Sequence, residues 1–173
     1  MKFYIRTILL GLAFLLSASL ATAAITVDAV SAKVAIRPSS LSVPHTTSGV
    51  DRLMLVGVSI DYAGSEIVSS VTYGGVGLTQ LGFQNRSDKV RVEIWSLIAP
   101  AVGSANLVVT FNNKVNRRAG MGVVTFTGVD QASATGVFYS DSGESKSPNV
   151  TIPSATDELA FAVIASIEQE SGS

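Results

Sequence analysis

Cysteine is absent from this chain of 173 residues. Its absence excludes disulfide bonds, thiolate metal sites and cysteine nucleophiles, and also a lipoprotein anchor, which needs a cysteine at the cleavage site. Without disulfides, the fold must be stabilised by a hydrophobic core, for which the chain is long enough. The composition, with 47% hydrophobic and 14% charged residues, is that of a folded domain.

Histidine is also scarce, because His45 is the only one in the sequence. A single imidazole cannot form a histidine-based metal site within one chain unless carboxylates supply the other ligands. The sequence contains no G-x-S-x-G motif, so a serine nucleophile with a histidine base is not indicated. We therefore expect no catalytic residue, no metal and no cofactor, and we expect His45 to lie in a polar loop before the apolar run at residues 52–60.

The N-terminus has the order of a secretory signal peptide. Lys2 and Arg6 give a positive start, residues 8–16 are apolar, and small residues follow up to Ala23. Nine strongly apolar residues are too few for a transmembrane helix, which needs about 20. We expect a signal-peptide helix at residues 1–23, cut after Ala23, and a single domain at residues 24–173. The alternative is an uncleaved anchor. With cleavage, the protein is expected to be secreted, extracellular or periplasmic, with no remaining membrane span.

Basic residues show no overall excess. Of the 12 lysines and arginines, Lys2 and Arg6 leave with the signal peptide, so ten remain against 13 acidic residues. This balance does not indicate a nucleic-acid partner, which would require a basic excess on one surface. The nearest approach to a basic patch is Lys114 with Arg117 and Arg118. These three charges, close to Asn112, Asn113 and Asn116, fit a solvated hairpin tip better than a phosphate-binding surface.

After residue 24 the sequence consists of short β-type runs separated by turn residues, without helical periodicity. Gly74 and Gly75, between the runs 68–73 and 76–83, predict a hairpin turn. The remaining predicted strands are residues 32–37, 52–60, 89–98, 105–112, 119–129, 150–152 and 158–167. This pattern predicts an all-β fold, an antiparallel β-sandwich of immunoglobulin-like or jelly-roll type.

Alternation along the strands predicts the core. Within residues 89–98, the apolar face would carry Val92 and Ile94, and the opposite face Arg91, Glu93 and Trp95. Together with positions on other strands, the predicted core is Leu53, Leu55, Val92, Ile94, Val109, Phe111, Val123, Phe126, Phe161 and Val163. Because an apolar run at 158–167 is followed only by the polar residues 168–173, we expect the domain to be truncated at its C-terminus.

Three side chains are candidates for ligand contact. Trp95 could stack on a sugar ring, although a lone tryptophan on a strand more often packs in a core. Arg117 and Arg118 could bind an acidic glycan or an anionic surface, and the alternative is that they keep a hairpin tip soluble. Three polar connections, residues 84–88, 112–118 and 141–149, are the expected places for binding residues.

Four strings occur in an ordered series: VSSVTYGGVGLTQL at 68–81, VEIWSLIAP at 92–100, ANLVVTF at 105–111 and TFTGVDQ at 125–131. In this order they resemble a β-sandwich module of exported and surface proteins of bacteria, often part of larger multidomain chains. The resemblance covers residues 40–167. It implies the fold and the exported location, and its motifs carry no catalytic residue.

Three functions remain open from the sequence. The first is a non-catalytic cell-surface module for adhesion, glycan contact or structural spacing, with an extracellular glycan or another surface protein as partner. The second is a fragment or accessory domain of an exported, carbohydrate-active hydrolase. The third is a structural subunit that assembles by strand addition at an open sheet edge.

Overall fold

The computed structural model describes residues 24–61, 64–65, 67–87, 89–144, 147 and 149–166, and these residues contain strands and no helix. The strands are β1 (Thr26–Ile36), β2 (Ser40–Thr47), β3 (Leu53–Asp61), β4 (Val68–Tyr73), β5 (Val76–Gly77), β6 (Thr79–Arg86), β7 (Val90–Ile98), β8 (Gly103–Phe111) and β9 (Arg118–Thr127). The expected signal-peptide helix, the cut after Ala23 and the polar residues 168–173 lie outside the described part. Within it, no helix could span a bilayer.

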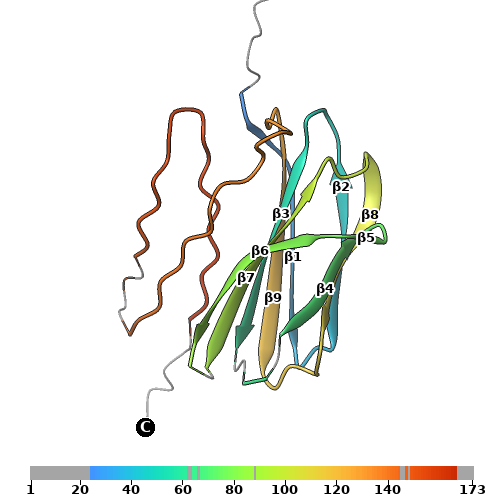
Figure 1. Cartoon of the computed structure of the whole chain (residues 1–173). Coiled ribbons are helices and arrows are strands. Elements are labelled where there is room, and N and C mark those ends of the chain that lie inside the picture. Colours follow the sequence, from blue (N-terminus) through green and yellow to red (C-terminus); the bar gives the residue numbers. More distant parts are fainter. Residues whose placement is uncertain are drawn as a thin grey trace, which may run out of the picture.

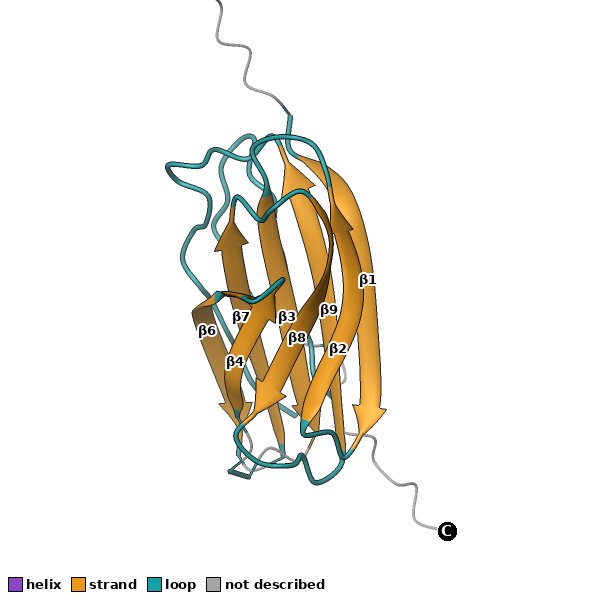
Figure 2. Ribbon diagram, turned by 90° about the vertical axis from the view of Figure 1, so that its right-hand side faces the viewer, coloured by secondary structure: helices purple, strands orange, loops and turns teal. Residues whose placement is uncertain are grey.

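The strands form two antiparallel sheets that face each other (Figures 1 and 2). One sheet has five strands in the order β1-β9-β3-β7-β6, and the other has four in the order β2-β8-β4-β5. β1 pairs with β9, β2 with β8 and β3 with β7, so the first strands pair with the last. The predicted all-β fold with antiparallel sheets is confirmed.

The main core lies between the two sheets and receives side chains from both. Its buried members are Leu41, Met54, Val56, Val58, Ile60, Val68, Val71, Tyr73, Leu78, Leu107, Val109, Phe111, Val115, Ala119, Met121 and Val123. The central strand β3 supplies its even-numbered residues to this core. Because successive side chains of a strand point to opposite faces, Leu53 and Leu55 point to the outer face of the five-stranded sheet. There they join a second cluster with Val129, against which Phe126 and Phe161 pack.

The predicted strand at residues 158–167 was wrong in its described part, because residues 158–166 lie in no strand. The expected weak strand at 150–152 is absent as well. The described residues after β9 (129–144, 147 and 149–166) form instead what we call the C-terminal layer. This layer lies beside the five-stranded sheet (Figure 1) and contacts its outer face through side chains, among them Phe161. Apolar composition therefore reflects packing against a sheet face here, without strand pairing.

The hairpin at Gly74 and Gly75 is confirmed, and both glycines have positive φ values of 56° and 86°. Only Val76 and Gly77 pair with β4, however. The expected single strand 76–83 is interrupted at Leu78, which is buried in the core. After this residue the chain crosses into the other sheet as β6. One apolar run therefore contributes a strand to each of the two sheets.

Candidate functional site

A row of small residues crosses the outer face of the five-stranded sheet. The register places Ala32 of β1 opposite Gly122 of β9, and Gly122 opposite Gly57 of β3. Ile94 of β7 follows, and it lies opposite both Gly57 and Gly82 of β6. Residues that lie directly opposite each other share a face of the sheet. We call these five residues the outer row; Ile94 is its single large side chain.

Two glycines of the outer row make room for the C-terminal layer. A Cβ atom added at Gly57 would lie 2.2 Å from Cγ2 of Val163, and one added at Gly82 would lie 2.3 Å from the ring of Phe138. Neither position has space for a methyl group. A Cβ at Gly122, by contrast, would meet no atom within 4 Å. Side chains of the C-terminal layer therefore occupy the row at β3 and β6, and the part at β9 and β1 is open.

The open part of the outer row belongs to a groove of about 370 Å³. One wall is formed by β1, with Val30 and Val34, and the other by residues 161–164 of the C-terminal layer, with Val163 and Ile164. The floor contains Gly120 and Gly122. The lining is mainly apolar and holds no charged side chain, so the groove offers hydrophobic contact and no acid–base chemistry.

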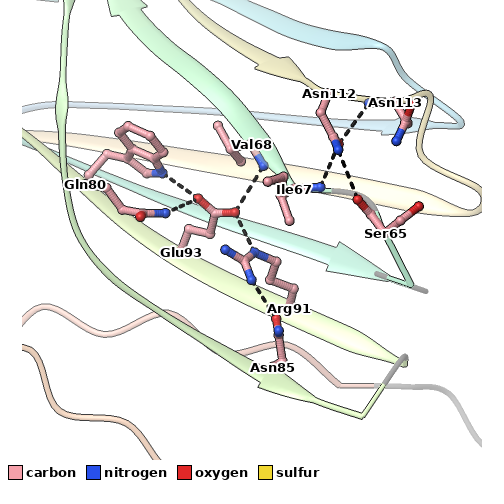
Figure 3. A network of polar contacts seen from close by, with 10 residues as sticks. Ser65, Ile67, Val68, Gln80, Asn85, Arg91, Glu93, Asn112 and Asn113 are labelled. Atoms are coloured by element: carbon pink, nitrogen blue, oxygen red, sulfur yellow. Dashed lines mark hydrogen bonds and ion pairs between the residues drawn. The ribbon is translucent and has the colours of Figure 1, made fainter.

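A polar network centred on Glu93 lies on the inner face of the same sheet (Figure 3). Glu93 is completely buried, and its Oε1 accepts hydrogen bonds from Nε of Arg91 (2.6 Å) and the backbone N–H of Val68 (3.1 Å). Its Oε2 accepts from Nε2 of Gln80 (2.6 Å) and Nε1 of Trp95 (2.9 Å). Four donors, one of them the positively charged Arg91, compensate the buried carboxylate.

Arg91 contacts two residues besides Glu93. Its Nη1 donates to Oδ1 of Asn85 at 2.8 Å, and its guanidinium lies 4.0 Å from the ring centroid of Phe83. Each oxygen of the Glu93 carboxylate accepts two hydrogen bonds, and the donors come from three strands. We therefore assign this network to the joining of β4, β6 and β7.

The network overturns two expected core positions. Val92 and Ile94 are half-buried on the outer face of β7, whereas Arg91 and Glu93 are buried on the inner face. The prediction that Val92 and Ile94 share one face of the strand is confirmed, but the prediction that this face points into the core was wrong. The pattern alone assigns apolar residues to the core, and here an ion pair with additional hydrogen bonds replaces them.

Trp95 lies on the same inner face as Glu93. Its ring is half-buried against the main core, and its indole N–H is bonded to Glu93. This position favours packing over sugar stacking, the alternative that the sequence left open.

His45 lies in β2 and not in a loop, so that expectation was wrong. The side chain is 2% exposed. Its Nδ1 lies 3.0 Å from Oγ of Ser31, and its Nε2 lies 2.8 Å from Oγ1 of Thr125. Desolvation by burial lowers the pKa of His45, and the nearby charge of Asp28 opposes this effect.

A serine beside a histidine invites comparison with a nucleophile and its base. A catalytic pair also needs a third group, usually a carboxylate, that orients the second ring nitrogen. In this structure Thr125 holds that position. The nearby carboxylate of Asp28 instead accepts hydrogen bonds from the backbone N–H (2.7 Å) and the hydroxyl of Ser48. The cluster therefore joins β1, β2 and β9 across the edge of the two sheets.

The β1–β2 and β8–β9 connections lie at the same end of the sheets (Figure 2), and both carry basic side chains. The backbone N–H of Arg37 bonds the carbonyl of Arg117 at 2.6 Å, and Nε of Arg37 bonds the carbonyl of Asn116 at 3.1 Å. Arg37, Lys114, Arg117 and Arg118 are exposed. We call these four residues the basic end. Sequence reasoning found three of them and missed Arg37, which comes from a different connection.

Acidic groups near the basic end are few among the residues that the structure describes. Oδ2 of Asp61 lies 3.9 Å from Nε of Arg117, at the outer limit of an ion pair. The side chain of Arg117 is still 57% exposed. Glu66, in the β3–β4 connection, is not among the described residues. The basic end therefore keeps guanidinium groups available to solvent.

The other two polar connections contact each other. Oγ of Ser140 donates to Oε1 of Gln84 at 2.8 Å, and Nη2 of Arg86 pairs with Oε1 of Glu144 at 2.6 Å. Here the C-terminal layer is fastened to β6, and opposite charges are already paired. Of the three expected loops, the one that joins β8 to β9 alone presents two basic side chains, Lys114 and Arg118, for which no ion pair is found in the described part of the chain.

No group of three or more metal-ligating side chains is found among the described residues. Comparisons with protein-family models, with curated proteins and with solved structures give no match.

Proposed function

We propose that this chain is a non-catalytic module of an exported or cell-surface protein that contacts an acidic glycan or another anionic surface through the basic end. The observation that carries the proposal is the convergence of Arg37, Lys114, Arg117 and Arg118 from two connections, with one acidic neighbour among the described residues. Guanidinium groups offer paired donors for carboxylate and sulfate oxygens. Residues at the end of a rigid pair of sheets are well placed for such contact.

Export and the type of fold are part of this proposal. The N-terminal sequence supports export, and so does the resemblance to modules of exported bacterial proteins. N-terminal sequencing of the secreted protein should begin at Ala24, and an intact Met1 would contradict cleavage. Among the two sandwich types, the pairing of β1 with β9, β2 with β8 and β3 with β7 favours the jelly roll, because it is the pattern of one long antiparallel ribbon wound over two sheets.

Binding at the basic end should depend strongly on salt. Exposed charges are screened over about 8–10 Å at physiological ionic strength. A contact made by exposed guanidinium groups is therefore strong at low salt and weak at high salt. Stacking on a buried aromatic ring would show a much smaller salt dependence.

A glycan array at low and at high salt tests the proposal. The wild type should bind acidic glycans at low salt, and the double variant Arg117→Ala/Arg118→Ala should lose this binding. The control variant Lys33→Ala removes an exposed basic side chain from the middle of β1, away from the basic end, and should bind as the wild type does. Absence of acidic ligands for the wild type, or equal loss in both variants, would refute the proposal.

A further inference from the structure

Three of the four sheet edges are protected against pairing with another chain. β2 contains Pro44, which has no N–H to donate to a further strand. β5 has two residues. β6 has an irregular register between Gln80 and Gly82 and is fastened to the C-terminal layer by Gln84 and Arg86. Short strands, prolines, bulges and covering segments are the usual protections of an edge.

The fourth edge, β1, has little such protection. It is an edge strand of 11 residues without proline, and it lies at the margin of the molecule (Figure 2). Its outer face carries Val30, Val34 and Ile36, which are 65%, 67% and 72% exposed. Lys33 is its single basic residue. Its bulge, between Val27 and Ala29, lies near one end and leaves residues 29–36 regular.

We propose that β1 pairs antiparallel with β1 of a second copy of this chain, about a two-fold axis at Ala32. In this register Val30 lies opposite Val34 of the second copy, Ser31 opposite Lys33, and Ala29 opposite Ala35. Two exposed valines at equal distances from a small residue are self-complementary, as an interface with two-fold symmetry requires. The five-stranded sheets of the two copies then join into one continuous sheet.

The neighbouring registers fit less well. An axis at Lys33 would place two lysines directly opposite each other, which is destabilising. An axis at Ser31 would place Val34 opposite Asp28, at the bulge. An axis between two residues would set inward-pointing side chains against outward-pointing ones, because directly opposite residues share a face. Of these registers, the one centred on Ala32 pairs Val30 with Val34 and keeps the two lysines from lying directly opposite each other.

The outer row supports the same centre. Ala32 is its end member at the sheet edge, next to the open position at Gly122. An axis at Ala32 therefore joins the outer rows of both copies end to end, and their open grooves become continuous. No bulky side chain lies at the junction. This interface goes beyond the proposed function and is independent of it, because β1 approaches the basic end only with its last residues.

The absence of cysteine permits a direct test by crosslinking. In the proposed dimer the Cα atoms of the two Ala32 residues are about 4.5–5.5 Å apart. A disulfide requires about 4.4–6.8 Å. The variant Ala32→Cys should therefore form a disulfide-linked dimer on mild oxidation. Val30→Cys, also at an exposed position, should not crosslink, because the two Val30 residues are four positions out of register, roughly 14 Å along the strand.

Two further measurements complete the test. An equimolar mixture of Val30→Cys and Val34→Cys should give a crosslinked heterodimer, since these positions are opposite each other. Sedimentation equilibrium should show a reversible dimer for the wild type and a monomer for Val30→Lys/Val34→Lys, with unchanged circular dichroism because both valines are exposed. A wild type that is monomeric at all concentrations, or equal crosslinking of Val30→Cys and Ala32→Cys, would overturn the proposal.

Discussion

Replacing Gly57 by alanine tests the contact between the C-terminal layer and the five-stranded sheet. The added methyl group would lie 2.2 Å from Cγ2 of Val163, so one of them must move. Gly57 lies in β3 and has no positive φ, so alanine causes no backbone strain there. The expected effect therefore comes from the overlap alone.

The structure sets the magnitude of this effect through two routes. If Val163 stays, overpacking costs about 1–3 kcal/mol. If the segment around Val163 leaves the sheet, the half-buried Val163 and Phe161 lose their contacts. Full burial of such a side chain stabilises by about 1.5–3 kcal/mol, so half burial of both corresponds to about 2 kcal/mol. The protein takes the cheaper route, and we expect a loss of about 1–2 kcal/mol in the free energy of unfolding.

Gly122→Ala is the matched control. Gly122 lies in the same outer row, directly opposite Gly57, and an added Cβ meets no atom within 4 Å. This variant should be about 0.4–1 kcal/mol more stable than the wild type, because alanine restricts the unfolded chain. Urea unfolding followed by the fluorescence of Trp95, the only tryptophan, measures both variants.

The combined variant Gly57→Ala/Val163→Ala separates overlap from other causes. Removal of the Val163 methyl groups should restore part of the stability lost in Gly57→Ala, which appears as a coupling energy in a double-mutant cycle. Equal stability of Gly57→Ala and Gly122→Ala would refute the contact. Absence of coupling with Val163 would assign the loss to another cause.

Three further predictions concern buried side chains. Glu93→Ala should cost about 3–5 kcal/mol, because it leaves the charge of Arg91 buried without its partner; a loss below 1 kcal/mol in urea unfolding would contradict this reading. Phe111→Ala should cost about 3–5 kcal/mol, since the ring is 5% exposed in the main core, and a similarly small loss would contradict that placement. Burial lowers the pKa of His45 below the ordinary value of 6.5, so the unfolded chain binds the proton more readily than the folded one. The free energy of unfolding should therefore fall as the pH drops below 6.5. Urea titrations at several pH values should show this dependence for the wild type and a flatter one for His45→Gln.

Two kinds of strand could be predicted from the sequence: strands that are buried on both faces, and strands that end at recognisable turn residues. Residues 52–60 are a near-continuous apolar run, and all but Arg52 lie in the central strand β3; Gly74 with Gly75 forms the expected turn. β2 was not predicted, because it contains Pro44 and several polar residues. Its side chains are buried by pairing partners from distant parts of the chain, which no local pattern contains.

The polar clusters were the least predictable part. Nothing near Glu93 in sequence indicates that the backbone of Val68 and the amide of Gln80 will donate to it, since both come from other strands. The same holds for His45, whose partner Thr125 is 80 residues away. Arg37 joins the basic end by a backbone hydrogen bond to Arg117. The spacing of residues along the sequence does not indicate these contacts, because the partners come from distant segments.

The pairing of the first strand with the last sets a time scale during synthesis. Thr26 meets Thr127, which is 101 residues further along the chain. At an elongation rate of about 5–20 residues per second, β1 waits roughly 5–20 s for its partner to be made. Throughout this delay its valines remain available to other chains, because pairings between distant segments form late and slowly. The growing polypeptide is therefore most exposed to aggregation before β9 is complete, and a chaperone or transport factor that holds the N-terminal strand would be most effective in that interval.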